Sequence, residues 1–207
     1  MKSPKINLII FDLDGVLLDK SIHFKALNKA LKTNTDIIIT EEEHEKYYDG
    51  RPTIQKLKLL ENNKGLDSKI FDKIWQSKQF WTRQLLEELK PNHKNIELLD
   101  KLKSDGYKLS LASNAIRDTI DIALVNLGLD GILDPLISNE DIRFPKPFPE
   151  CYWKCMTYWR SIPMNTLIIE DSYVGIQGAR NSGAHVYECI EDKYLDYDII
   201  TRYIELL

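Results

Sequence analysis

The start of the chain carries a short apolar run that stops abruptly on acids. Residues 8–11 read Leu-Ile-Ile-Phe, and they are followed by Asp12, Asp14 and Gly15. An unbroken run of β-branched and aromatic side chains is typical of a strand that is buried on both faces. Because strand side chains alternate, Asp12 and Asp14 are expected on one side. The pattern therefore predicts a buried strand with two carboxylates at its carboxyl end.

The next stretch, residues 20–89, shows helical spacing of its apolar positions. Ile37-Ile38-Ile39 is the only rival strand pattern and is short. Thr40 and Glu43 have the spacing of a capping box, which marks a helix start. Helices are predicted over residues 21–31, 41–48, from 53 to about 61, and 67–89.

From residue 91 onward, strand and helix patterns alternate. Repeated strand–helix units predict a parallel sheet with right-handed crossovers. We therefore expect an α/β, doubly wound, Rossmann-like core from residues 1–19 and 90–207, with residues 20–89 inserted as an α-helical cap. The remaining strands are predicted at 107–112, 133–137, 166–169 and 184–188, and the helices at 96–102, 117–127, 148–159 and 174–181.

Polar side chains follow three of the predicted strands, and a lysine lies in a loop that reaches the same edge. The carboxyl ends of parallel strands meet at one edge of a sheet, so these groups should converge. Clustered carboxylates repel one another, and a hard divalent cation such as Mg²⁺ is their natural neutraliser. With a lysine, a hydroxyl and an amide nearby, the same set describes a phosphate site. The converging residues are Asp12, Asp14, Ser113, Asn114, Lys146, Glu170 and Asp171.

Composition narrows the class of protein. The chain has 207 residues, is 43% hydrophobic and carries a net charge of −4 without a basic patch, which disfavours nucleic-acid binding. Three cysteines without a C-x-x-C pair indicate a reducing compartment. No apolar run reaches the length of a signal-peptide core or a membrane span. We expect a cytoplasmic protein with a small-molecule substrate and no membrane partner, as a monomer or weak homo-oligomer.

The ordered motifs resemble those of the haloacid dehalogenase superfamily, and most closely its phosphatase and β-phosphoglucomutase-like branch with an α-helical cap. The resemblance covers about residues 1–20 and 90–190, and more loosely the helical block between them. The matching residues are Asp12-x-Asp14-Gly15, Ser113-Asn114, Lys146 and Glu170-Asp171-Ser172-x-x-Gly175.

The resemblance implies a Mg²⁺-dependent phosphatase that hydrolyses a small phosphomonoester, of the sugar phosphate or nucleotide class, through an aspartyl-phosphate. Asp12 is then the nucleophile, and Asp14 the general acid for the leaving oxygen and the general base for water. Phosphate contacts are implied for Ser113, Asn114 and Lys146. The implied metal ligands are Asp12, the Asp14 carbonyl, Asp171 and Glu170. Glu170 would either coordinate the metal directly or contact a residue that does.

In the cap, Gly50-Arg51-Pro52-Thr53 resembles a substrate-specificity loop. Arg51 would meet an anionic substrate group there, or the segment is only a helix–helix turn with proline at the first helical position. His23 matches a linker histidine of relatives only with a gap, and packing is the simpler interpretation of it.

Two alternatives stay open, and two positions depart from the family pattern. A phosphohexomutase of the β-phosphoglucomutase kind shares every core motif, although Thr53 stands where the mutase arginine is expected. A non-catalytic binding module on the same fold is the other alternative, and the intact acid pair and Lys146 argue against it. Val16 stands where many family phosphatases have threonine, and Pro145 replaces the glycine usual before the motif lysine.

Overall fold

Five strands form one parallel sheet in the computed structural model, which describes residues 6–189 and 195–207. The strand order is β3-β2-β1-β4-β5, so the first strand of the chain lies in the middle of the sheet. Leu8 of β1 is paired with Lys108 of β2 on one side and with Thr166 of β4 on the other. The strands are β1 (Leu8–Phe11), β2 (Lys108–Ala112), β3 (Leu136–Ile137), β4 (Thr166–Glu170) and β5 (His185–Glu188).

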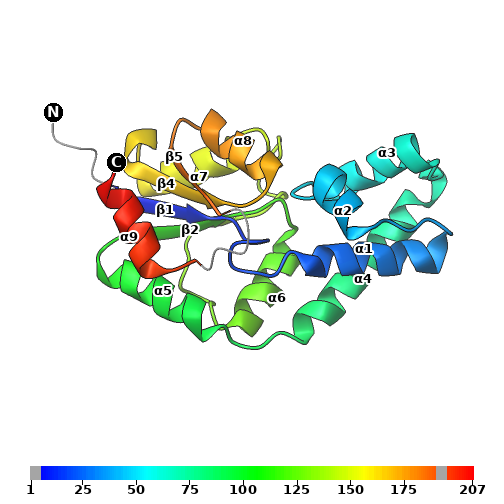
Figure 1. Ribbon diagram of the computed structural model, residues 1–207, viewed down its shortest axis with the longest axis horizontal. Helices are drawn as coiled ribbons and strands as arrows, with labels where there is room; N and C mark the ends of the chain where they lie inside the picture. Colours follow the sequence, from blue (N-terminus) through cyan, green and yellow to red (C-terminus); the bar gives the residue numbers. More distant parts are fainter. Residues whose placement is uncertain (1–5, 190–194) are drawn as a thin grey trace.

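Helices cover both faces of this sheet (Figure 1). Ile9 and Phe11 of β1 pack toward one helical layer, and Leu8 and Ile10 pack toward the other, with all four side chains fully buried. A strand buried on both faces carries apolar residues at successive positions, as residues 8–11 do. The first layer contains α5 (His93–Ser104), α6 (Arg117–Leu127) and α9 (Tyr197–Glu205), and the second contains α7 (Glu150–Trp159) and α8 (Tyr173–Asn181).

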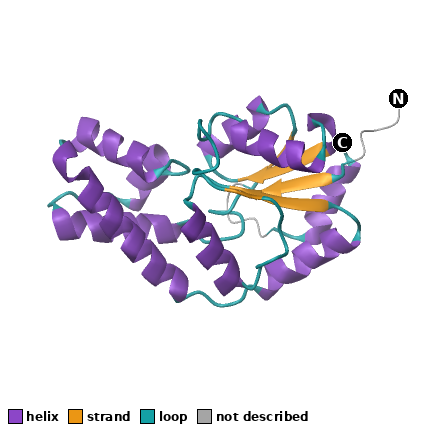
Figure 2. Ribbon diagram, turned by 180° about the vertical axis from the view of Figure 1, so that it is seen from behind, coloured by secondary structure: helices purple, strands orange, loops and turns teal. Residues whose placement is uncertain are grey.

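A second group of helices lies beside the carboxyl edge of the sheet, and strands are confined to the other part of the molecule (Figure 2). This helical cap has its own hydrophobic cluster, to which Leu27, Leu57 and Ile74 belong. The predicted doubly wound α/β core with an inserted helical cap is thus confirmed. The cap contains α1 (Ser21–Asn34), α2 (Glu41–Glu43), the π-helix η1 (His44–Tyr48), α3 (Thr53–Lys64), the 3₁₀-helix η2 (Ser68–Ile70) and α4 (Phe71–Glu87).

Local signals explain several element boundaries. Thr40 and Glu43 form both bonds of the predicted capping box at the start of α2. The segment Ile37-Ile38-Ile39 is not a strand, although Ile38 is exposed and Ile39 is buried in the cap. The strand predicted at 133–137 is shortened to Leu136–Ile137, and Pro135 before it has no N–H to donate to a ladder. A short 3₁₀-helix, η3 (Pro163–Asn165), precedes β4.

Helix α9 lies beyond the last predicted element, which ends at Glu188.

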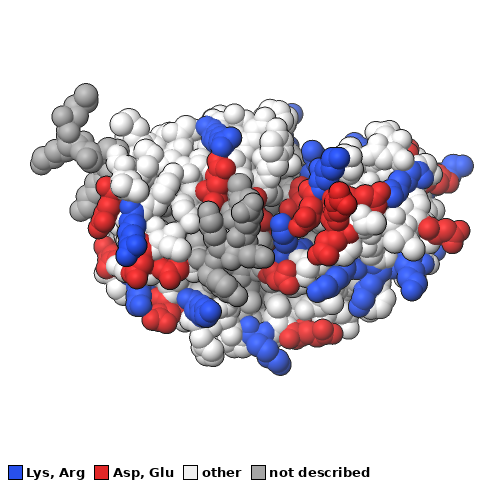
Figure 3. Space-filling view, viewed as in Figure 1, with Lys and Arg blue, Asp and Glu red and all other residues white. Residues whose placement is uncertain are grey.

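Among residues 6–189 and 195–207, no helix has the length and apolarity that crossing a bilayer requires. On the face shown in Figure 3, basic and acidic side chains are interspersed over both the core and the cap.

Candidate active site

Asp12 and Asp14 leave the middle strand where the chain turns sharply. The backbone N–H of Asp12 donates to the Ile169 carbonyl at 3.0 Å, which extends the pairing of β1 with β4. Gly15 has a φ of +89°, and a side chain there would collide with the Asp171 carboxylate. Glycine is therefore required at this turn both by the backbone conformation and by the close approach of Asp171.

Lys146 joins the acids at the centre of the site. Its side chain is 2% exposed, and Nζ donates to Asp12 Oδ1 at 2.6 Å, to the Ala112 carbonyl at 2.8 Å and to Glu170 Oε1. Burial lowers the pKa of Lys146, but the carboxylates of Asp12 and Glu170 outweigh it and raise that pKa above its ordinary value. A buried ammonium is stable only when it is paired in this way, so Lys146 is held as a cation.

The carboxylates of Asp12, Glu170 and Asp171 lie close together, and their combined negative charge exceeds the single positive charge of Lys146. Oxygens of Asp12, Glu170 and Asp171 lie within 4.8 Å of one another. Burial, and next the charge of Glu170, raises the pKa of Asp171 to about 8 and raises the pKa of Asp12 as well. Asp171 Oδ1 is buried and has no hydrogen-bond partner in the described part of the chain. Hard oxygen donors with an orphaned carboxylate oxygen fit a Mg²⁺ ion.

Glu170 is oriented by Tyr152, a neighbour that sequence reasoning missed. The Tyr152 hydroxyl donates to Glu170 Oε1 at 2.6 Å and lies 3.2 Å from the Gly175 carbonyl. A side chain at Gly175 would collide with the Glu170 carboxylate. Oε1 is thus held by Lys146 and Tyr152, while Oε2 lies 3.5 Å from the Ser172 hydroxyl. The only sequence signal for Tyr152 is its place on the apolar face of α7.

Ser113 and Asn114 reach the same pocket from the end of β2. Ser113 is 1% exposed, and its Oγ accepts from the Ala115 N–H at 3.0 Å, which leaves its own O–H to donate. Asn114 Oδ1 accepts from the Lys146 N–H at 3.1 Å. Asn114 Nδ2 donates to the Gly50 carbonyl at 2.7 Å, so this residue links the core to the cap loop. Neither residue caps α6, which begins at Arg117.

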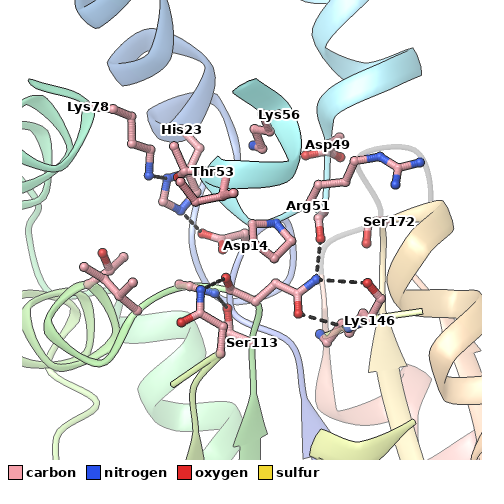
Figure 4. A pocket seen from close by; sticks show the side chains of 18 of the residues that line it. Asp14, His23, Asp49, Arg51, Thr53, Lys56, Lys78, Ser113, Lys146 and Ser172 are labelled. Carbon is pink, nitrogen blue, oxygen red and sulfur yellow. Dashed lines mark hydrogen bonds and ion pairs between the residues drawn. The ribbon is translucent and has the colours of Figure 1, made fainter. Parts of the chain in front are cut away.

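A chain of polar contacts leads from Asp14 into the cap (Figure 4). His23 Nε2 lies 2.8 Å from Asp14 Oδ1, and His23 Nδ1 lies 3.1 Å from Lys78 Nζ. Burial lowers the pKa of His23 and lowers the pKa of Lys78 to about 7. Neutral His23 can accept from Lys78 at Nδ1, while its Nε2 lies close to Asp14 Oδ1 without the alignment of a hydrogen bond. Burial would raise the pKa of Asp14, but His23 and Lys78 hold it below its ordinary value.

Sequence reasoning undervalued this chain of contacts. Packing was the simpler interpretation of His23, yet it is buried against Asp14. Lys78 carries no local signal, since it lies 55 residues from His23. Arg51 lines the pocket, and its Nε donates to the Tyr47 carbonyl at 3.1 Å, so its role as a substrate contact stays a prediction. Its guanidinium points away from Asp14 (Figure 4).

Core and cap together enclose a cavity of about 90 Å³ at this site. Ser113 and Lys146 lie on its core side, and Thr53, Lys56 and Lys78 lie on its cap side (Figure 4). This cavity is large enough for a phosphate group, and it is lined by Asp12, Asp14, Lys146 and Ser113. The arrangement can hold an anion beside a carboxylate that is shielded from bulk water.

Comparison with known proteins agrees with this geometry. A family model described as haloacid dehalogenase-like hydrolase matches residues 9–188. Pyrophosphatase PpaX of Bacillus velezensis is 24% identical over 192 aligned residues, which cover 88% of this chain and 82% of that protein.

Two solved structures share the fold. A β-phosphoglucomutase of Clostridium difficile is 21% identical with a TM-score of 0.84, covering 97% of this chain and 98% of the other. A predicted phosphoglycolate phosphatase of Haemophilus somnus is 20% identical with a TM-score of 0.76, covering 96% and 97%.

Proposed function

The chain belongs to the haloacid dehalogenase-like hydrolases, and from this we propose that it is a Mg²⁺-dependent phosphatase that hydrolyses a small phosphomonoester through an aspartyl-phosphate. One observation carries the proposal: Lys146 holds the carboxylates of Asp12 and Glu170 in a buried group with Asp171. A carboxylate that must attack an anionic phosphate needs such neighbouring positive charge.

In the first step, an oxygen of Asp12 attacks phosphorus and the bond to the leaving oxygen breaks. Ser113 keeps an O–H that can donate to a phosphoryl oxygen as charge builds up on it. Lys146 Nζ already donates to Asp12, Ala112 and Glu170, so it acts as a positive charge beside the attacking carboxylate. Asp12, Glu170, Asp171 and the Asp14 carbonyl would hold Mg²⁺, which when bound offsets the charges of the carboxylates and the phosphate.

Asp14 acts as the general acid in the first step and as the general base in the second. In its acid form it gives a proton to the leaving oxygen, and as a carboxylate it then takes a proton from the water that attacks the aspartyl-phosphate. The second step releases phosphate and restores Asp12. The contact of His23 with Asp14 favours the carboxylate form, which is the form needed for the second step.

We also propose that residues 20–89 act as a lid over this chemistry. The bond from Asn114 to Gly50 ties the cap loop to the phosphate end of the site. Closure of a lid excludes water before the first step and strengthens the electrostatic interactions inside.

The test is phosphate release by the purified protein from a panel of phosphomonoesters with Mg²⁺. Asp12→Asn should abolish release, while the exposed acid Asp130, changed to Asn, is the matched control and should leave it intact. Chelation with EDTA should stop the reaction, and added Mg²⁺ should restore it. Activity that persists in a verified Asp12→Asn preparation would exclude the aspartyl-phosphate route.

Phosphohexomutase activity is the second candidate, because the mutase shares the same core motifs. Product analysis on β-glucose 1-phosphate separates the two reactions. Free glucose and phosphate identify a phosphatase, and an isomerised sugar phosphate identifies a mutase. Thr53, at the place where a mutase arginine is expected, lines the pocket and favours the phosphatase.

A further inference from the structure

Lys78 is an amine in the pocket that the proposed phosphatase mechanism does not use. It lies on α4, is 5% exposed and lines the cavity together with Ser113 and Lys146. In the described part of the chain, no ion pair within 4.0 Å joins Lys78 to an acid. Buried lysines normally have such a partner. A lysine that is buried beside a cavity without one has the surroundings of a nucleophile.

The groups that face Lys78 favour its uncharged amine. Its Nζ lies 3.1 Å from His23 Nδ1, and a neutral imidazole nitrogen accepts a hydrogen without supplying negative charge. Burial, and next the charge of Lys56, lowers the pKa of Lys78 to about 7, while the charge of Asp14 opposes this shift. At pH 7 about half of the molecules therefore carry the free amine, against about one in 3000 for a lysine with the ordinary pKa.

The cavity has room for a small electrophile between this amine and the core. Ser113 and Lys146 lie on the core side, where the reacting phosphate is assigned, and Lys78 lies on the cap side (Figure 4). A cavity of about 90 Å³ holds roughly six to nine waters. Acetyl phosphate is of that size. With its phosphate on the core side, its acyl carbon is the part of the molecule that is directed toward the cap.

We propose that Lys78 is a modification site for short acyl phosphates, which bind with the phosphate on the core side and transfer the acyl group to Nζ. This rests on the proposed function, because that function assigns the core side to phosphate. The amine attacks the acyl carbon and forms an N–C bond, and the bond from this carbon to the phosphate oxygen breaks. Hydrogen phosphate leaves with the proton that the nitrogen loses, so the acyl phosphate is the only co-reactant.

The product suits the site better than the ammonium group does. An N-acyl-lysine keeps one N–H, which can still donate to His23 Nδ1, and it carries no charge that burial penalises. The acyl group also occupies part of the cavity that a substrate needs. Acylation of Lys78 is therefore expected to lower the phosphatase activity.

A purely structural role explains Lys78 less well. A neutral donor would supply the contact with His23 without a buried charge, whereas the ammonium form of Lys78 lowers the stability of the cap. Residues that lower stability are typical of sites with a chemical or binding role.

The first test incubates Asp12→Asn with acetyl phosphate and Mg²⁺ at pH 7 and measures acetylation of each lysine by quantitative mass spectrometry. This variant lacks the proposed nucleophile, so turnover does not consume the reagent. We expect Lys78 to be acetylated at least about tenfold faster than Lys73, which is exposed on the same helix. A less basic group is also a weaker nucleophile, so the advantage is smaller than the ratio of the free-amine fractions. Equal or slower acetylation of Lys78 would overturn the inference.

The second test separates delivery by the phosphate group from the reactivity of the amine. Inorganic phosphate should compete with acetyl phosphate and protect Lys78, but not Lys73. Ser113→Ala should slow acetylation of Lys78 by acetyl phosphate about fivefold or more, because it removes the hydroxyl from the core side. The same variant should react normally with N-hydroxysuccinimide acetate, which has no phosphate.

The matched control for Ser113→Ala is Ser104→Ala, which changes an exposed serine of α5 and should not alter the rate. An unchanged rate in folded Ser113→Ala would refute delivery by the phosphate group. If Ser113→Ala does not fold, competition by inorganic phosphate still decides, and a lack of protection at Lys78 has the same meaning.

The loss of activity is measured on the wild type. After treatment with acetyl phosphate and removal of the reagent, hydrolysis of p-nitrophenyl phosphate should fall in proportion to the acetylated fraction of Lys78. Lys78→Arg keeps a cation and has no amine of this kind, so its own activity should fall less under the same treatment. An equal relative loss in both proteins would show that acetylation of Lys78 does not control the activity.

Failure of this inference is distinguishable from failure of the proposed function. If p-nitrophenyl phosphate is hydrolysed but Lys78 is acetylated no faster than Lys73, only the modification site is wrong. If no phosphomonoester is hydrolysed, the proposed function fails. The acetylation of Lys78 in Asp12→Asn still decides on the modification site, because that reaction needs no turnover.

Discussion

Replacing Lys78 by methionine should stabilise the protein while it damages the site. Burial, and next the charge of Lys56, lowers the pKa of Lys78 from its ordinary 10.5 to about 7. Between these two values the unfolded chain binds more protons at this position than the folded chain. The contribution of Lys78 therefore makes the free energy of unfolding of the wild type increase as the pH rises from 7 to 10.5.

The size of the effect follows from this pKa shift. At pH 7 the buried ammonium lowers the free energy of unfolding by about 4 kcal/mol, and at pH 9 by about 2 kcal/mol. Methionine has nearly the same shape and no charge, but it leaves His23 Nδ1 without its donor, at a cost of about 1–3 kcal/mol. We expect Lys78→Met to be more stable than the wild type by about 1–3 kcal/mol at pH 7. At pH 9 this difference in the free energy of unfolding should be smaller by about 2 kcal/mol.

Urea unfolding of the metal-free protein at pH 7, 8 and 9 measures this difference. Circular dichroism and tryptophan fluorescence must give coincident transitions for the free energies to be compared. Lys73→Met, exposed on the same helix, is the matched control and should show no stabilisation that depends on pH. A Lys78→Met variant that is less stable than the wild type at pH 7, with an unchanged pH dependence, would refute the reasoning.

Two further predictions concern the residues that hold the site together. Tyr152→Phe removes the donor to Glu170 Oε1, so the Mg²⁺ affinity of the metal-free protein, measured by calorimetry, should fall about tenfold. Tyr158→Phe on the same helix should not change it, and equal affinities of Tyr152→Phe and the wild type would contradict the role of the phenol. Asn114→Ala removes the bond to Gly50, so amide hydrogen exchange of residues 49–51 should become faster and KM should rise. Unchanged exchange in this loop would show that the bond does not hold the cap.

The sequence predicts the core side of the site because its signals are local. Asp12, Ser113 and Glu170 each follow a recognisable strand, and parallel strands bring their carboxyl ends to one edge wherever the chain goes in between. The loop of Lys146 lies next to that edge for the same reason. The roles of these residues stay predictions until they are tested, but their convergence needed no knowledge of side-chain packing.

The cap side of the site was not predictable in the same way. The contacts of His23 with Lys78 and of Lys56 with His44 depend on how α1, η1, α3 and α4 pack against one another. A helical pattern gives the buried face of each helix but not its neighbours or its rotation. The orientation of Glu170 by Tyr152 likewise depends on the packing of α7 against β4. Cytoplasmic location, oligomeric state and the exact limits of the cap stay predictions.

The central place of β1 in the sheet has a consequence for how the protein is made. The strand that leads to Asp12 is synthesised first, but its two neighbours begin only at Lys108 and Thr166. The helices α1 and α4 that pack together in the cap are complete by residue 87. Pairs that are closer in sequence form earlier, so the lid is expected to fold on the ribosome while the catalytic strand still has open, apolar edges. The strand that leads to Asp12 thus waits longest for its partners during synthesis.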